Sequence, residues 1–164
     1  MMSAGNGAMY GNIQGIKNLM SHYDKDGDYI NPVNGLAGLL VTDDNENSRR
    51  RIISIPDSSK EEMYELTKKE FLRENGVHNG DTTKRTDVYN NLYRKMSKKD
   101  RLAAGYTLEK YERIYRQAFY DAAKKADPNW EIGKPIKAGA LDDVTRETAE
   151  TGKSPAQATL DTKI

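Results

Sequence analysis

The sequence predicts a mainly α protein: a small helical domain of about four helices, with one short β-hairpin and extended N- and C-terminal arms. Apolar residues recur at helical spacing in four segments, and two apolar or β-branched runs flank a polar turn between the first and second segments. Residues 1–12 and 139–164 have no apolar period that could bury a face. We therefore expect one helical domain at residues 13–138 between two arms.

Composition further limits the possible architecture and chemistry of the protein. The chain has 164 residues, of which 36% are hydrophobic, and this fits one domain and leaves little apolar material for a second. The absence of Cys excludes disulfides, thiol nucleophiles and Cys-ligated metals. No run approaches the roughly 18 apolar residues of a membrane span, and residues 1–10 lack the features of a signal peptide. We expect synthesis in the cytoplasm and no membrane span.

The first helix is predicted at residues 12–23 and the hairpin at about residues 36–55. The hairpin consists of strands at 36–42 and 50–55, joined by the polar turn 43–48 and ended by Pro56. Gly35 and Gly38 weaken a helical interpretation of the first strand, although a short helix is the alternative. The first helix depends on an apolar set at helical spacing, interrupted by Gly15: Ile13, Ile16, Leu19, Met20 and Tyr23.

The next two helices have start and stop signals. Ser59 and Glu62 form a capping-box pattern, and this helix is expected to end at Asn75-Gly76. A further helix is expected to begin at Thr86 or Asp87 and to end by Gly105, with residues 97–104 extending it or starting a new one. Its apolar face consists of Val88, Tyr89, Leu92, Tyr93 and Met96.

The last predicted helix has the longest apolar stripe. Thr107 is its expected N-cap, and Asp127-Pro128 ends it. Its small residues Ala118, Ala122 and Ala126 suit close packing against another segment. The core is predicted from Leu66, Phe71, Leu92, Leu108, Tyr115 and Phe119.

The most specific local pattern is YDKDGDYINPVN at residues 23–34, in which three carboxylates occupy alternate positions. Ca²⁺ is a hard cation that takes about six to eight oxygen ligands, and alternating side chains converge when a chain turns around it. The sequence therefore predicts a Ca²⁺ site with Asp24, Asp26, Asp28 and Asn34 as ligands. The alternative is a solvated Asp and Gly turn.

Residues 16–34 resemble the first half of an EF-hand. DKDGD is similar to the opening of the calcium loop, and Ile16, Met20 and Tyr23 lie where that family has the apolar residues of its entering helix. Ile30-Asn31, after the acidic triplet, also resembles the dockerin variant. The resemblance implies a Ca²⁺-binding loop after a helix.

The loop also departs from the EF-hand pattern. That family has Gly at the sixth loop position and a bidentate Glu at the twelfth. Here Tyr29 follows Asp28 directly, and the twelfth position is Gly35, or Asn34 if one residue is deleted. The sequence contains no second loop to form a pair. We therefore expect weak Ca²⁺ binding.

A second pattern is basic and aromatic. Tyr89 and Tyr93 are interleaved with basic residues, and three Arg at residues 49–51 form another cluster. The two Tyr share an arc with apolar residues, which favours a core position for them and a solvated charged face. Contact with phosphate or nucleic acid is the alternative function of seven residues: Lys84, Arg85, Arg94, Lys95, Lys98, Lys99 and Arg101.

Catalytic motifs are absent from the sequence. There is no nucleophile elbow, zinc-protease motif, P-loop or dinucleotide fingerprint, and His22 and His78 stand alone. We expect no enzymatic activity and no catalytic residue. The alternative is a carboxylate-dependent hydrolase or toxin domain, which would draw on Glu61, Glu62, Glu65 or Glu70.

These observations favour a non-enzymatic structural or adaptor subunit of a larger assembly. The chain has ten Tyr against two Phe and one Trp, and Tyr suits surfaces that are half buried against a partner. Arms of this composition are typical of subunits that thread over their neighbours, and we expect contacts with other protein subunits through them. A bacteriophage virion protein is the specific expectation, and a small calcium-binding helical module is the alternative.

Overall fold

The protein is described by a computed structural model over residues 22–78 and 82–152. Four α-helices follow one another: α2 (Asp57–Arg73), α3 (Thr82–Lys95), α4 (Arg101–Ala126) and α5 (Arg146–Thr151). A 3-10 turn, η1 (Lys98–Asp100), precedes α4. Within the described residues no strand forms, and two isolated bridges pair short stretches of the N-terminal loop. The predicted mainly α class is confirmed.

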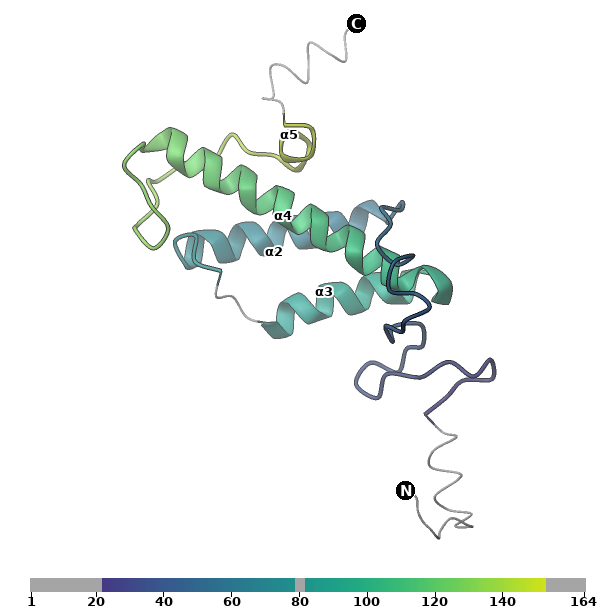
Figure 1. Ribbon diagram of the computed structural model, residues 1–164. Coiled ribbons are helices and arrows are strands. Elements are labelled where there is room, and N and C mark those ends of the chain that lie inside the picture. Colours follow the sequence, from purple (N-terminus) through teal and green to yellow (C-terminus); the bar gives the residue numbers. More distant parts are fainter. Residues whose placement is uncertain (1–21, 79–81, 153–164) are drawn as a thin grey trace, which may run out of the picture.

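Helix α4 is the centre of the fold. Figure 1 shows it crossing α2 and α3, and it contacts both of them as well as α5. The Phe119 ring centroid lies 5.4 Å from that of Tyr64 and 5.8 Å from that of Phe71, both on α2. The predicted core is confirmed, with Leu66 partly buried and five residues buried: Phe71, Leu92, Leu108, Tyr115 and Phe119.

Trp130 is a large core residue that periodicity does not reveal, because it lies after the end of α4 at Ala126. Its ring centroid lies 6.0 Å from that of Phe71 and 5.6 Å from that of Tyr120. The indole Nε1–H donates to the Lys134 carbonyl at 2.7 Å, so this buried ring keeps its polar group satisfied. The segment after α4 therefore closes one end of the core.

Helix α4 begins seven residues earlier than predicted, with Asp100 as its N-cap residue, and Gly105 lies inside it. The prediction that Gly105 ends a helix is wrong because the missing side chain serves packing instead. A Cβ at position 105 would lie 2.7 Å from the Tyr93 hydroxyl oxygen on α3. Thr107 is buried in the helix and is not its N-cap.

The predicted hairpin at residues 36–55 does not form, and neither does the alternative short helix. The Thr107 hydroxyl accepts from the Ile53 N–H at 3.0 Å and donates to the Arg51 carbonyl at 3.2 Å. In the turn, the Asn45 side chain bonds the Thr42 N–H at 2.9 Å and the Leu40 carbonyl at 3.0 Å. Side chains thus take the backbone bonds that a strand ladder would use.

The start of α2 also differs from the prediction. Pro56 is the N-cap residue, without a side-chain cap, and the predicted capping box is absent. The Ser59 side chain is buried, and its hydroxyl has no hydrogen-bond partner among the described residues. Glu62 instead accepts from the Asn91 amide on α3 at 3.2 Å. Packing between α2 and α3 has overridden the local capping signal.

The start of α3 differs from its predicted position, whereas the end of α2 agrees with it. Helix α3 begins at Thr82, ahead of the predicted start at Thr86 or Asp87, so neither of those residues is its N-cap. After α2, Asn75 and Gly76 have φ values of 53° and 83°. This left-handed pair ends the helix as predicted.

The C-terminal arm was predicted to begin at residue 139, and this boundary is wrong. Residues 139–152 pack against the helices, with Leu141 and Ala149 buried. The Tyr64 hydroxyl donates to the Val144 carbonyl at 2.9 Å, and the Tyr115 hydroxyl donates to Glu150 at 2.6 Å. A few well-placed apolar residues dock this stretch without any helical period.

Three predictions fall outside the described residues: the N-terminal arm at 1–12, the part of the first helix at 12–21, and the C-terminal arm at 153–164. Tyr23, the last residue of that predicted helix, pairs in a bridge with Tyr29. Among the helices that the structure describes, none combines the length and the apolar character needed to cross a membrane.

Candidate functional site

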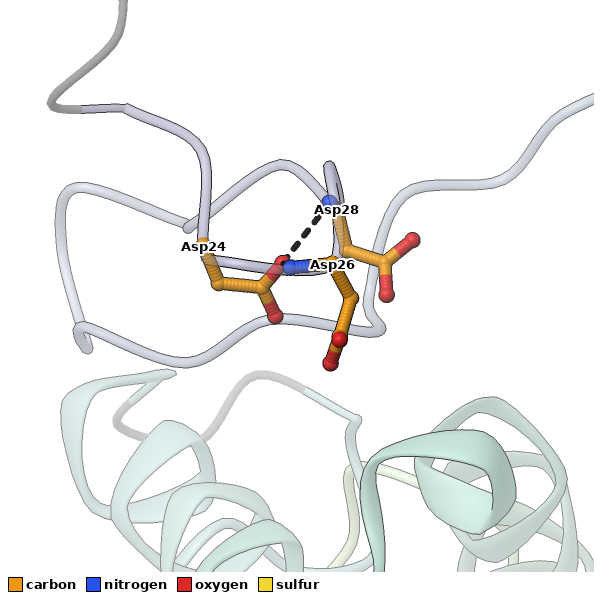
Figure 2. A group of neighbouring side chains, drawn as sticks. All are labelled: Asp24, Asp26 and Asp28. Atoms are coloured by element: carbon orange, nitrogen blue, oxygen red, sulfur yellow. Dashed lines mark hydrogen bonds between the residues drawn. The ribbon is translucent and has the colours of Figure 1, made fainter.

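The acidic loop, defined as residues 24–28, is a tight turn built by its first residue. The Asp24 carboxylate accepts from the Asp26 N–H at 3.0 Å and from the Asp28 N–H at 2.8 Å. Figure 2 shows the three side chains and the bond from the Asp28 N–H to Asp24. Gly27 has a φ of 83°, which L side chains rarely adopt. Local sequence alone therefore explains why the three carboxylates gather.

The carboxylates converge closely enough to share one cation. One oxygen from each of Asp24, Asp26 and Asp28 lies within 4.8 Å of the others. Lys98 of η1 supplies that cation: its Nζ lies 2.8 Å from Asp24, 2.7 Å from Asp26 and 2.6 Å from Asp28. The ammonium group thus joins the loop to the start of α4.

The ion pairs change the proton affinity of the groups involved. The hydrogen bond from Lys98 and those from backbone N–H groups lower the pKa of Asp24. Hydrogen bonds to Asp24, Asp26 and Asp28 raise the pKa of Lys98. Three carboxylates against one ammonium leave a net charge of about −2, which attracts a further or a replacement cation.

The donor set fits a Ca²⁺ ion in part. Carboxylate oxygens are the ligands that Ca²⁺ prefers, but it takes about six to eight of them, so three carboxylates need backbone or solvent oxygens as well. Asn34 is occupied elsewhere: it accepts from the Leu36 N–H at 3.0 Å and donates to Asn90 at 3.1 Å. Residues 35–56 contain no exiting helix, so the EF-hand likeness is confined to the acidic loop.

Five of the seven basic residues are paired within the described part of the chain. Arg85 binds Glu112, Lys95 lies 3.0 Å from Ser58, and Arg101 donates to the carbonyls of Tyr93 and Ala37. Arg94 bonds Asn91 on its own helix, and Lys98 binds the acidic loop. Of the seven candidates for phosphate contact, the exposed side chains of Lys84 and Lys99 alone have no partner among the described residues.

The Arg cluster at residues 49–51 is also paired. Arg49 and Arg50 both bind Glu46, at 3.3 and 2.7 Å, and Arg51 lies 3.9 Å from Asp100. These basic side chains hold the turn at 43–48 together. Their positive charge is therefore largely balanced within the chain.

An ion pair between the half-buried Arg85 and the buried Glu112 links α3 to α4 and was missed by sequence reasoning. The Arg85 guanidinium forms a bidentate contact with Glu112, with Nη2 2.6 Å from Oε1. Tyr89 adds a hydrogen bond of 3.4 Å, and His78 lies 4.0 Å from the same carboxylate. The partners are 27 residues apart, so no local pattern could pair them. His78 itself is exposed, as predicted.

The four carboxylates considered for catalysis all lie on α2 but have separate surroundings. Glu61 pairs with Arg146 at 3.4 Å, and Glu62 bonds Asn91. Glu65 is exposed, whereas Glu70 is buried 4.0 Å from Arg73. No two of them share a partner, and the expectation of no enzymatic activity stays a prediction.

Comparison with known proteins identifies a family but no function. No curated protein and no solved structure matches the chain. A family model described as "Domain of unknown function (DUF3879)" matches residues 1–164. The match covers the whole sequence, so the chain belongs to the DUF3879 family of domains of unknown function.

Proposed function

We propose that this protein is a non-enzymatic structural or adaptor subunit of a larger assembly, with a bacteriophage virion as the specific setting. One observation carries the proposal. Among the residues that the structure describes, eight large apolar side chains are exposed, and five of them lie in residues 22–55, a segment without helix or strand: Tyr23, Val33, Leu40, Val41 and Ile52. Apolar side chains gathered on an irregular segment are suited to contact with a partner.

The segment is also held firmly enough to present these side chains. Lys98 binds its acidic loop, Arg101 donates to the Ala37 carbonyl at 2.8 Å, and Thr107 bonds Arg51 and Ile53. A fixed surface loses less conformational entropy on binding than a free loop does. The contacts with η1 and α4 therefore support an interaction role for residues 22–55.

The test is incorporation into an assembly in the source cells. A tagged chain is expected to sediment in a large complex, and the triple variant Leu40→Asp/Val41→Asp/Ile52→Asp should sediment as a free subunit. The matched control is Val77→Asp/Ile132→Asp, which changes exposed apolar residues outside the segment. Sedimentation of the unmodified chain as a monomer would contradict the assembly role, and mass spectrometry of purified particles tests the virion setting.

The second candidate function, weak Ca²⁺ binding, is favoured by the convergence of the three carboxylates on one point. Ca²⁺ must compete with the Lys98 ammonium. We expect a Kd on the order of 10⁻⁴ to 10⁻³ M, the weak end of the range for protein sites. The cation would then act structurally, holding the acidic loop as Lys98 does.

Calorimetry of Lys98→Met tests this candidate. Removal of the ammonium group should tighten Ca²⁺ binding severalfold, while Lys99→Met, next to it and without a partner among the described residues, should leave binding unchanged. Asp26→Asn should weaken binding. Sub-micromolar affinity of the unmodified chain, or no heat with Lys98→Met at millimolar Ca²⁺, would contradict the proposed site.

A further inference from the structure

A pocket of about 470 Å³ lies between residues 22–55 and the start of α4. Its volume is within the roughly 300 to 1,000 Å³ that is typical of ligand sites. Part of its wall is apolar. Tyr23 and Leu40 line it from the N-terminal segment and expose 44% and 54% of their surface, and Leu102 and Ala103 line it from α4. Both sides of the pocket therefore offer apolar contacts.

The pocket also has cations that no internal ion pair fully occupies. Four cationic side chains and one carboxylate line it: Arg49, Arg51, Lys98, Lys99 and Asp28. Lys98 and Asp28 pair at 2.6 Å, and Arg49 pairs with Glu46 at 3.3 Å. Arg51 is half exposed and lies 3.9 Å from Asp100, and Lys99 has no partner among the described residues. Arg51 and Lys99 are therefore available to an anion.

These two features favour a ligand with a single carboxylate next to an apolar group. A carboxylate accepts charge-assisted hydrogen bonds from guanidinium and ammonium groups. Inorganic phosphate would leave the apolar part of the wall uncovered. A polyanion such as nucleic acid would meet the acidic loop, whose Gly27 and Asp28 also line the pocket and whose net charge repels it. A peptide with Asp or Glu beside an apolar residue meets both requirements.

We propose that the pocket binds a short peptide segment of a partner subunit, with one carboxylate on Lys99 and Arg51 and a neighbouring apolar side chain against Tyr23 and Leu40. The inference rests on the proposed assembly role and adds the chemistry of the partner. The cations make the contact selective, because an apolar segment without a carboxylate leaves them unpaired.

NMR titration of the ¹⁵N-labelled full-length chain with N-acetyl-leucine tests the pocket. This compound carries one carboxylate and one apolar side chain, and a ligand of its size should bind with a Kd of the order of millimolar. The amide signals of Gly38, Leu40 and Leu102, which line the pocket, should shift. N-acetyl-leucinamide lacks the charge and should bind about fivefold more weakly, as expected for the loss of one partly exposed ion pair.

Lys99→Met should weaken the binding of N-acetyl-leucine about fivefold and leave that of the amide unchanged. Lys84→Met is the matched control, because Lys84 is also exposed and without a partner among the described residues but does not line the pocket. Equal affinity for the acid and the amide would overturn the proposal. Tighter binding of inorganic phosphate at the same signals would also overturn it, in favour of a phosphate ligand.

The sedimentation experiment separates this inference from the assembly role. Lys99→Met should lower the fraction of the chain in the large complex, whereas Lys84→Met should not. No binding of N-acetyl-leucine by a chain that sediments in a complex would overturn the pocket and leave the assembly role standing. Monomeric sedimentation of a chain that binds N-acetyl-leucine would contradict the assembly role and the partner, and only the preference of the pocket for carboxylates would remain.

Discussion

Lys98 shows how much of the candidate site the sequence can reveal at the scale of single residues. Asp24, Asp26 and Asp28 are adjacent in sequence, and their convergence follows from the turn that Asp24 caps. Lys98 lies 74 residues after Asp24 and belongs to a run of basic residues that looks like a solvated face. Sequence reasoning therefore predicted the anionic half of the site, and only the fold supplies its cation.

The acidic loop should detach at low pH. The pKa of Asp24 is lowered in the folded state, so its contribution to stability is present above the ordinary pKa of Asp and is lost as the pH falls through the folded value. The pKa of Lys98 is raised in the folded state. Its contribution to stability is therefore fully present below the ordinary Lys value of 10.5 and is lost as the pH rises through the folded value.

Ring signals of Tyr23 and Tyr29, whose centroids lie 5.9 Å apart beside the loop, can follow this release by NMR. They should stay constant from about pH 5 to 9 and shift below about pH 4, since Asp titrates near there. Signals of the buried Phe119 ring serve as the control. A shift of the two Tyr rings near neutral pH would contradict the assigned ion pairs.

Loss of the Phe119 ring should be strongly destabilising. It is fully buried and contacts the rings of both Tyr64 and Phe71. Phe119→Ala should lower the free energy of unfolding by roughly 3 to 5 kcal/mol, through lost transfer energy and the cavity left behind. Lys99→Ala should change it by under about 0.5 kcal/mol. Urea melts compare the two variants. An unchanged midpoint for Phe119→Ala would mean that this ring does not belong to the core.

At the scale of elements, periodicity predicted the existence of α2, α3 and α4 but not where they begin. The boundaries failed where a tertiary contact competes with a local signal. Gly105 is a helix breaker by propensity, yet α4 continues through it because Tyr93 packs there. Thr107 is a good N-cap residue, yet its hydroxyl bonds the backbone of residues 51–53. Neither partner is close in sequence.

Gly38→Ala should detach the N-terminal segment from η1. Gly38 has a φ of 85°, and an added Cβ would overlap the Lys98 carbonyl, a backbone atom that cannot rotate away. Gly35 is the matched control, because its φ is 73° but a Cβ there would meet nothing within 4 Å. Gly35→Ala should therefore cost only the left-handed strain, roughly 1 to 2 kcal/mol.

Amide chemical shifts of Asp24, Asp26 and Asp28 distinguish the two variants. In Gly38→Ala these shifts should move toward those of Lys98→Met, in which the ion pairs are absent. In Gly35→Ala they should stay near those of the unmodified chain. Equal shifts for the two glycine variants would mean that the contact with the Lys98 carbonyl does not hold the loop.

At the scale of the whole described molecule, the core of α2, α3 and α4 carries an irregular N-terminal segment and a C-terminal segment that is irregular apart from α5. Residues 22–55 attach to η1 and α4 through Lys98, Arg101 and Thr107. Residues 127–152 attach through the buried side chains of Trp130, Leu141 and Ala149. Neither segment has a period that reveals its buried residues, so the first was mistaken for a hairpin and the end of the second for a free arm.

Truncation at residue 138 should therefore destabilise the protein much more than truncation at residue 152. Loss of residues 139–152 removes the buried side chain of Leu141 from the core. Burial of a Leu side chain contributes roughly 1.5 to 3 kcal/mol to stability. It also removes the acceptors of the Tyr64 and Tyr115 hydroxyls, at roughly 0.5 to 1.5 kcal/mol for each hydrogen bond. The combined loss is a large share of the roughly 5 to 15 kcal/mol that stabilises a domain.

Urea melts of chains ending at residues 138, 152 and 164 measure this difference. The midpoint should fall only slightly from 164 to 152 and steeply from 152 to 138. Tyr115→Phe in the full-length chain separates the two contributions, because it removes the hydroxyl bonded to Glu150 and leaves Leu141 buried. Identical midpoints for the chains ending at 138 and 152 would mean that residues 139–152 behave as the predicted arm. The packing of α5 on α4 would then contribute nothing measurable to stability.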